Sequence, residues 1–142
     1  MAISARNMFE GKISAIRSSR VNAEVTLTTP EQLEIVAIIT LQSLKEMGIQ
    51  VGQTARAYIK APWLLLHKGE KPIQASARNQ FLGQVCQLKR GMVNIMVTVA
   101  LAEGSLVQTV ITKDAFHELA LAEGDRVGVL FKANHVLLGI FE

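Results

Sequence analysis

The second half of the sequence repeats the first. When the chain is shifted by 72 residues, the two halves of the 142-residue sequence align without a gap. The aligned pairs include SARNMFEGKI (4–13) with SARNQFLGQV (76–85), VNAEVTL (21–27) with VNIMVTV (93–99), and YIKAPWLLL (58–66) with LFKANHVLL (130–138). A polar stretch with a Gly and a Pro lies between the copies. The sequence therefore predicts two domains of one kind, residues 1–67 and 75–142, joined by a linker at 68–74.

Each copy is small for an independent domain. A domain of about 60 residues buries only about 60% of the surface of its unfolded chain, so its stability is marginal. The single cysteine, Cys86, cannot form a disulfide within the chain, and we expect it to be a small buried apolar residue. Further burial must come from the sister copy or from other chains, so the sequence predicts self-assembly.

Alternating apolar and polar residues predict a mainly β fold. The alternation is clearest at 21–28, and strands are also expected at about 9–16, 54–60 and 63–67. The continuous apolar run at 33–39 predicts a more deeply buried strand. Thr40 as the N-cap and Gly48 beyond the last turn predict a short helix at 41–47. This order is typical of all-β OB barrels, so we expect two tandem OB-like five-stranded antiparallel barrels, each with one short helix.

The sequence contains no recognisable catalytic or metal site. None of the three histidines has a Cys, Asp or Glu at metal-ligand spacing, and no P-loop, dinucleotide fingerprint or nucleophile elbow is present. No apolar run approaches the roughly 18 residues that span a bilayer, and the N-terminus lacks the pattern of a secretory signal. We therefore expect a soluble cytoplasmic protein that is not an enzyme and has no cofactor, no bare metal ion and no membrane partner.

Cationic hydrogen-bond donors are kept in both copies. Ser4 and Ser76, Arg6 and Arg78, and Lys60 and Lys132 are aligned pairs, although many other polar positions differ between the copies. The chain has 15 Lys and Arg against 12 Asp and Glu, a net charge of +3. Without the four aligned cations, 11 would remain and the net charge would be −1. The basic excess therefore belongs to this motif, which predicts an anion site in each copy.

The donor set also indicates the kind of anion. Guanidinium forks and hydroxyl groups suit a tetrahedral oxyanion. No acidic residue lies within SARN or next to the lysine in IKA, so the motif has no carboxylate to accept a bond from a protonated anion. A fully deprotonated dianion is therefore favoured, and sulfate, molybdate and tungstate all remain open.

These segments resemble the molbindin family. The stretches ISARNMFEGKI, VNAEVTL and YIKAPWLLL are similar to those of Mop or TOBE-type molybdate-binding domains, and the match covers essentially the whole chain. The chain therefore resembles the tandem, di-Mop form. The resemblance implies an OB-like fold, cytoplasmic molybdate storage and homeostasis without catalysis, possible binding of tungstate, and assembly as a homotrimer.

The resemblance also assigns site residues, with each oxyanion held between protomers. It implies one shell in each copy, which we call the first and second donor sets: Ser4, Ala5, Arg6, Lys60 and Ala61, and their counterparts Ser76, Ala77, Arg78, Lys132 and Ala133. A second class of site is expected nearer a threefold axis, and its candidates, the secondary set, are Asn7, Val21, Asn22, Asn79, Val93 and Asn94.

Other functions are less favoured by the sequence. An OB module that binds nucleic acid would use stacking aromatic residues along a basic groove, whereas aromatics make up 5% of this chain. A sensor module of a molybdate-responsive regulator would need a helix-turn-helix for DNA binding, and no segment is long enough to supply one. We therefore expect no nucleic-acid partner.

Overall fold

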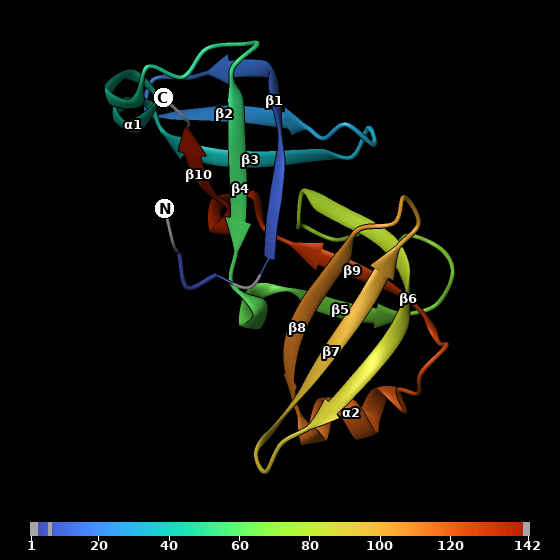
Figure 1. Cartoon of the computed structure of the whole chain (residues 1–142). Coiled ribbons are helices and arrows are strands. Elements are labelled where there is room, and N and C mark those ends of the chain that lie inside the picture. The colour runs from blue at the N-terminus through green and yellow to red at the C-terminus, as the bar shows by residue number, and fades with distance from the viewer. Residues whose placement is uncertain (1–2, 6, 141–142) are drawn as a thin grey trace. The chain divides into compact units, whose positions relative to one another are not determined.

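The computed structural model describes residues 3–5 and 7–140 (Figure 1). The elements of the first copy are β1 (Asn7–Ser18), β2 (Asn22–Thr28), β3 (Glu34–Thr40), α1 (Leu41–Met47), β4 (Thr54–Ile59), the 3-10 helix η1 (Ala61–Trp63) and β5 (Leu65–Lys68). Those of the second copy are β6 (Asn79–Arg90), β7 (Asn94–Leu101), β8 (Leu106–Thr112), α2 (Lys113–Leu119), β9 (Arg126–Phe131), the 3-10 helix η2 (Ala133–His135) and β10 (Leu137–Ile140). The predicted five strands and one short α-helix per copy are confirmed.

The ten strands form two antiparallel sheets, and each sheet takes its fifth strand from the other copy. One sheet has the order β5-β9-β6-β7-β8 and the other β10-β4-β1-β2-β3. Accordingly the chain divides into two compact units. The β6 unit comprises Met1–Asn7 and Lys60–Phe131, and the β1 unit comprises Met8–Ile59 and Lys132–Glu142. The last strand of each sequence copy, β5 or β10, thus belongs to the compact unit built mainly from the other copy.

The pairing of the exchanged strands is regular. In the β6 unit, β5 pairs with β9 from Leu65 opposite Leu130 to Lys68 opposite Val127. In the β1 unit, β10 pairs with β4 from Leu137 opposite Tyr58 to Ile140 opposite Ala55. The two fifth strands are aligned segments of the repeat, so sequence alone could not say which sheet each would join.

Strand alternation places the apolar side chains of each sheet in a core. Along β2, Ala23, Val25 and Leu27 are fully buried, while the residues between them are half-buried. The apolar run in β3 was expected to be more deeply buried throughout, and this was wrong. In β3, Ile35 and Ala37 are buried while Val36 and Ile38 remain half-buried, because successive residues of a strand point to opposite faces of the sheet and only one face packs on the core.

Both short α-helices begin at a threonine cap. The Thr40 side chain accepts a bond from the backbone N–H of Ser43, and α1 ends at Gly48 in the left-handed conformation, as predicted. Thr112 caps α2 in the same way by accepting from Ala115, but α2 ends at Ala120 with φ of 49°. Neither described helix has the length or the apolar run that crossing a membrane requires.

Two local predictions were wrong. Trp63 was expected to begin a strand over 63–67, whereas it lies in η1 and β5 begins at Leu65, because Ala61–Trp63 forms a 3-10 turn before the chain becomes extended. Cys86 was expected to be buried, and it is exposed. The register of β6 against β7 shifts between Val85 and Gln87, so Cys86 occupies a β-bulge that turns its side chain away from the core.

Candidate functional site

The first SARN segment is attached to the free edge of β8 by Asn7. The Asn7 amide donates to the backbone carbonyl of Gln108 (2.8 Å) and accepts from the Gln108 N–H (2.7 Å). β8 is the outer strand of its sheet, so the asparagine side chain satisfies backbone groups that an edge strand would otherwise expose. Asn7 is 3% exposed, so these bonds form in a buried environment.

The segment that carries Lys60 is attached to the next residue of the same strand. The Thr109 hydroxyl lies 2.6 Å from the carbonyl oxygen of Leu64 and 3.1 Å from that of Ala61. Thr109 is 1% exposed, so these bonds form in a buried environment where unsatisfied carbonyls are costly. The ammonium group of Lys60 lies 5.7 Å from the centre of the Trp63 ring.

Together these contacts bring most of the first donor set to one edge of the β6 unit. Ser4 is exposed and Ala5 half-buried just before Asn7, while Ala61 is buried beside the exposed Lys60. Arg6, the predicted guanidinium of this set, lies outside the described residues. Both segments bind neighbouring residues of β8, although they are more than 50 residues apart in the sequence. The role of these side chains as oxyanion ligands stays a prediction.

The second donor set is divided between the two units. Ser76 and Arg78 are exposed and Ala77 is half-buried in the β6 unit, whereas Lys132 is exposed and Ala133 buried in the β1 unit. The backbone at Lys132 has φ of −76° and ψ of 141°, close to the −69° and 139° at Lys60. The two lysine turns therefore share one conformation, although PW in one copy is NH in the other.

The secondary set does not gather within one unit. Asn79 is 2% exposed at the start of β6, whereas Val93 and Asn94 are exposed beyond the other end of that strand. Asn7 in turn is held by Gln108. The ligand roles assigned to these residues stay predictions. In the structure, Asn7 bonds to the backbone of β8.

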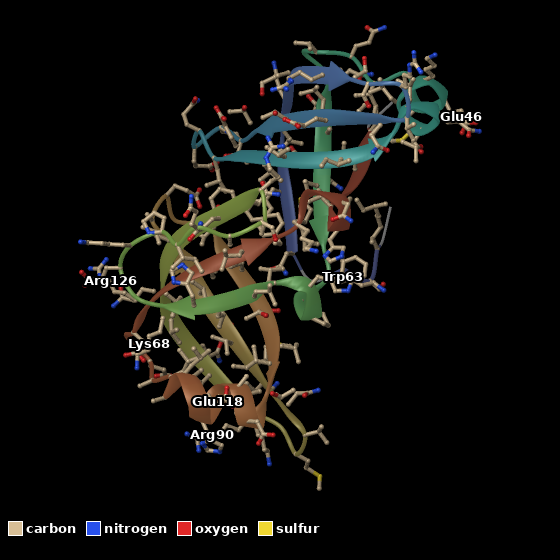
Figure 2. All side chains as sticks on the ribbon, turned by 180° about the vertical axis from the view of Figure 1, so that it is seen from behind. Glu46, Trp63, Lys68, Arg90, Glu118 and Arg126 are labelled. Carbon is tan, nitrogen blue, oxygen red and sulfur yellow. The ribbon has the colours of Figure 1, made fainter. Side chains whose placement is uncertain are left out.

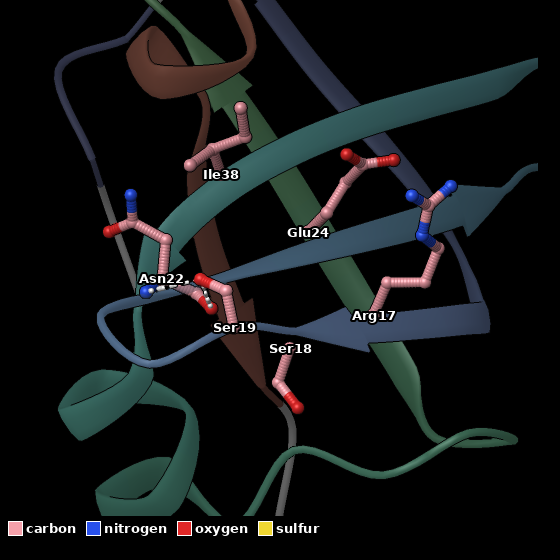
Figure 3. Close-up of a pocket in the computed structure, with 6 residues that line it drawn as sticks. All are labelled: Arg17, Ser18, Ser19, Asn22, Glu24 and Ile38. Carbon is pink, nitrogen blue, oxygen red and sulfur yellow. Dashed lines mark hydrogen bonds between the residues drawn. The ribbon is translucent and has the colours of Figure 1, made fainter.

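Asn22 borders a hollow at the β1–β2 turn (Figure 3). The hollow has a volume of about 220 Å³ and is lined by Arg17, Ser18, Ser19, Asn22, Glu24 and Ile38. Backbone and side-chain bonds between Ser19 and Asn22 close the turn, the shortest being 2.8 Å from the Ser19 N–H to the Asn22 carbonyl. Val21 is 68% exposed.

The lysines of the two donor sets are not neutralised within the described part of the chain. Its ion pairs are Arg56–Glu10 (3.0 Å), Lys68–Asp125 (3.3 Å) and Arg126–Glu70 (3.7 Å). None of these involves Lys60 or Lys132. The bonds from Tyr58 and Glu10 raise the pKa of Arg56, so that cation is held by neighbours of its own. Lys60 and Lys132 are exposed, and their role as anion ligands stays a prediction.

The structure adds two residues that the sequence did not single out. Gln108 anchors SARN through its backbone, which leaves no signature in sequence. Thr109 leaves a weak signature in the sequence, because it is a hydroxyl residue at the buried position aligned with Ala37. A buried threonine in one copy against an alanine in the other signals a hydrogen bond that only one copy makes.

Comparisons with known proteins place both halves of the chain in one domain family. The TOBE domain family matches the chain twice, at residues 3–66 and 75–138. The chain is 36% identical over 140 residues to the molybdenum transport protein ModE of Herbaspirillum seropedicae, with 99% of this chain and 52% of the relative covered. It is 34% identical over 140 residues to the molybdenum-pterin-binding protein MopA of Rhodobacter capsulatus, with 99% and 53% covered. The chain thus spans about half the length of the curated relatives it matches.

A solved structure extends the likeness over two complete chains. The cytoplasmic molybdate-binding protein ModG, crystallised with molybdate bound, superposes with a TM-score of 0.93 at 38% sequence identity. The match covers 99% of this chain and 100% of ModG. The predicted resemblance to Mop or TOBE-type proteins is confirmed: the chain belongs to the TOBE domain family and carries two TOBE domains in tandem.

Proposed function

We propose that this protein binds molybdate in the cytoplasm for molybdenum storage and homeostasis, without converting it chemically. One observation carries the proposal. Asn7 and the Lys60 turn are anchored to neighbouring residues of β8, which brings the described members of the first donor set to one edge of the β6 unit. Support also comes from the likeness to ModG, which is described as a cytoplasmic molybdate-binding protein.

The donors suit this ligand. Serine hydroxyls, arginine guanidinium groups and lysine ammonium groups supply charge-assisted hydrogen bonds to the oxygens of a dianion. Ala61 and Ala133 are 2% exposed, and backbone N–H groups at these turns would add donors without charge. One Arg and one Lys per shell balance the two negative charges of molybdate. Tungstate has the same charge and shape, so we propose that it binds as well.

We further propose that the working form is a homotrimer whose shells lie between protomers. The exposed donors Ser4, Ser76 and Lys132 have room for a second set of partners. An oxyanion between protomers would bridge cations that otherwise repel one another. Native mass spectrometry with and without molybdate tests the assembly, and a monomer that binds with full affinity would contradict it.

The ligand assignment is tested by calorimetry and by elemental analysis after dialysis against molybdate. Each charge-assisted bond contributes roughly 1.5–3 kcal/mol, so Arg78→Ala or Lys60→Ala should weaken binding at its own site about tenfold to a hundredfold. Lys89→Ala removes an exposed cation outside both donor sets and serves as the control. Unchanged molybdate affinity in the double variant Arg6→Ala, Arg78→Ala would refute the assignment, and equal affinity for sulfate would reduce it to a general oxyanion site.

A second function is favoured by the relatives named ModE. The Escherichia coli ModE, a DNA-binding transcriptional dual regulator, is 31% identical over 137 residues that make up 51% of its length. The same tandem domains could therefore serve as the molybdate-sensing part of a regulator. We propose that the tandem domains themselves do not contact nucleic acid. A regulator would therefore need a separate DNA-binding partner or segment. A salt-dependent gel shift of duplex DNA by this chain alone would show that the tandem domains do bind nucleic acid.

A further inference from the structure

A cationic hollow lies in the β6 unit, at the opposite end of β6 from its SARN segment. It has a volume of about 160 Å³ and is lined by Arg90, Gly91, Ile95, Lys113, Phe116 and His117. Arg90 is the last residue of β6 and the others come from the following turn, β7 and α2. Figure 2 shows Arg90 beside α2. These residues belong to neither donor set nor to the secondary set.

Helical spacing puts the donors of α2 on one face. Lys113 and His117 are four residues apart and Phe116 three from Lys113, so all three project from the same side of the helix. The acidic residues Asp114 and Glu118 each follow a donor by one position, which places them about 100° further around the helix. The face directed at the hollow therefore carries positive or neutral groups, and the acids lie on the adjoining face.

The Phe116 ring contacts both Arg90 and His117. Phe116 is 5% exposed, the Arg90 guanidinium lies 5.2 Å from the ring centre, and the His117 ring meets it edge-on at 5.5 Å. A guanidinium stacked on an aromatic face keeps its N–H groups available along the ring edge. In the described part of the chain, no carboxylate forms an ion pair with Arg90 or Lys113.

The backbone N–H of Gly91, which lines the hollow, is already bonded to the Asn94 carbonyl at 2.9 Å. The floor is apolar, formed by the buried Ile95 and Phe116. The hollow thus combines cations that form no ion pair in the described part of the chain with a buried apolar base.

The repeat shows that this hollow is particular to the second copy. The aligned residues of the first copy are Ser18 for Arg90, Leu41 for Lys113, Leu44 for Phe116 and Lys45 for His117. Two cations, an aromatic platform and an imidazole therefore occur together in one copy, where the other has a hydroxyl, two leucines and a lysine.

We propose that this hollow is a separate anion site that binds a phosphate group, either as inorganic phosphate or at the end of a phosphate monoester. The Arg90 fork binds two of its oxygens, and the Lys113 ammonium and the His117 ring bind the others. Arginine suits planar two-point recognition of phosphate, and lysine adds a mobile point charge. An apolar floor beneath the cations also offers a surface to the organic part of a monoester.

The test is a titration of the full chain with inorganic phosphate and, separately, with glycerol 2-phosphate. Calorimetry gives the affinity, and NMR follows the Arg90 Nε–H signal. Arg90→Ser and Lys113→Leu each introduce the residue that the first copy has, and circular dichroism checks their folding. Each should weaken phosphate binding about tenfold or more, and phosphate should shift the Arg90 signal of the unaltered chain.

Two control variants make the result specific. Lys89→Ser removes the exposed neighbouring cation and should leave phosphate affinity within about twofold, since successive strand residues point to opposite faces of the sheet. Arg78→Ala alters the second donor set, which is proposed to bind molybdate, and should also leave the phosphate affinity unchanged. This result would separate the phosphate site from the proposed molybdate function. Equal losses in Lys89→Ser and Arg90→Ser, or an Arg90 signal that phosphate does not move, would overturn the proposal. Tighter binding of the monoester would identify an organic phosphate as the ligand.

Discussion

The two lysine turns have the same backbone but different support. In the β6 unit, the turn at Ala61–Trp63 is bonded through two carbonyls to the Thr109 hydroxyl. In the β1 unit, the turn at Ala133–His135 contacts β3, where the residue aligned with Thr109 is Ala37, which has no hydroxyl. Pro62 fixes the backbone of the first turn, and Asn134 replaces it in the second.

This difference shows how duplicated motifs diverge. The lysine and the alanine that follow it are identical in the two turns, while the residues that hold them have changed. Pre-organised donors lose less conformational freedom when they bind a ligand. We therefore expect the first turn to present Lys60 more rigidly than the second presents Lys132. Substitutions at aligned positions can remove or transfer this support.

The largest effect is expected from Asn7→Asp. The buried carboxylate would keep the bond from the Gln108 N–H but would face the Gln108 carbonyl, to which the amide now donates. A buried charge without a partner costs roughly 3 kcal/mol or more. Burial raises the pKa of a carboxyl group, so stability lost at neutral pH should return as the pH falls and the group is protonated. Urea unfolding at several pH values measures this.

Asn7→Ala is the matched control for that substitution. It removes both bonds without adding a charge, so its stability loss should not depend on pH. Molybdate affinity at the first donor set should fall in both variants, because SARN would no longer be fixed to β8. An Asn7→Asp protein as stable at pH 8 as the unaltered chain would show that the contact with Gln108 is not made in solution.

Thr109→Val should have the next largest effect. The substitution keeps the shape of the side chain but removes the hydroxyl that bonds the Leu64 carbonyl at 2.6 Å. The Ala61 carbonyl keeps its bond from the Leu64 N–H (3.2 Å), so the cost of about 1–3 kcal/mol comes mainly from the Leu64 carbonyl. Molybdate affinity should fall toward that of the site served by the second turn. Thr98→Val, a buried threonine on the neighbouring strand, is the control for urea unfolding and calorimetry. Equal effects of both variants would mean that the hydroxyl of Thr109 has no special role.

Local sequence signals predicted most of the elements. The alternation of residues 21–28 gave β2, and the Thr40 and Gly48 caps gave α1 with the bounds observed, because strand pattern and capping depend on residues close in sequence. The edge position of β3 and the bulge at Cys86 were missed. Both depend on how strands pair, which the apolar pattern of one segment does not encode.

The donor residues could be named from the repeat, but their placement could not. SARN and the lysine turns stand out because both copies keep them. Their attachment to β8 joins residues 101 positions apart for Asn7 and Gln108 and 48 apart for Ala61 and Thr109. The exchange of β5 and β10 was equally hidden, since aligned segments fit either sheet and only the folded topology chooses between them.

The ends of the two α-helices differ in backbone strain, and the strained end is that of α2 in the β6 unit. Ala120 adopts φ of 49° after α2, where Gly48 has φ of 63° after α1. A left-handed conformation costs a residue with a Cβ about 1–2 kcal/mol, part of which is offset by the greater chain entropy of glycine. Ala120→Gly should therefore stabilise the protein by roughly 1 kcal/mol in thermal or urea unfolding. A loss of stability would show that the Ala120 methyl group makes contacts that outweigh the strain.

The smallest effect is expected at a turn that is charged in one unit and neutral in the other. Asp125 accepts from the Ala122 N–H at 2.9 Å, and the aligned Gln53 accepts from the Gln50 N–H at 2.7 Å. The bond from Ala122, helped by Lys68, lowers the pKa of Asp125 below its ordinary value of 3.8. A carboxylate with a lowered pKa in the folded state stabilises the protein fully above that ordinary value, and this contribution disappears as the pH falls through the folded pKa. Asp125→Gln, which introduces the residue of the first copy, should therefore be slightly less stable than the unaltered chain at pH 7. The difference should shrink below about pH 4 as the carboxylate of the unaltered chain is protonated.

Gln53→Glu tests the converse, because a carboxylate placed at the neutral turn should make the β1 unit sensitive to acid over the same range. Thermal unfolding from pH 2 to pH 7 measures both, and a difference between Asp125→Gln and the unaltered chain that stayed constant across that range would show that the charge at this turn does not contribute to stability.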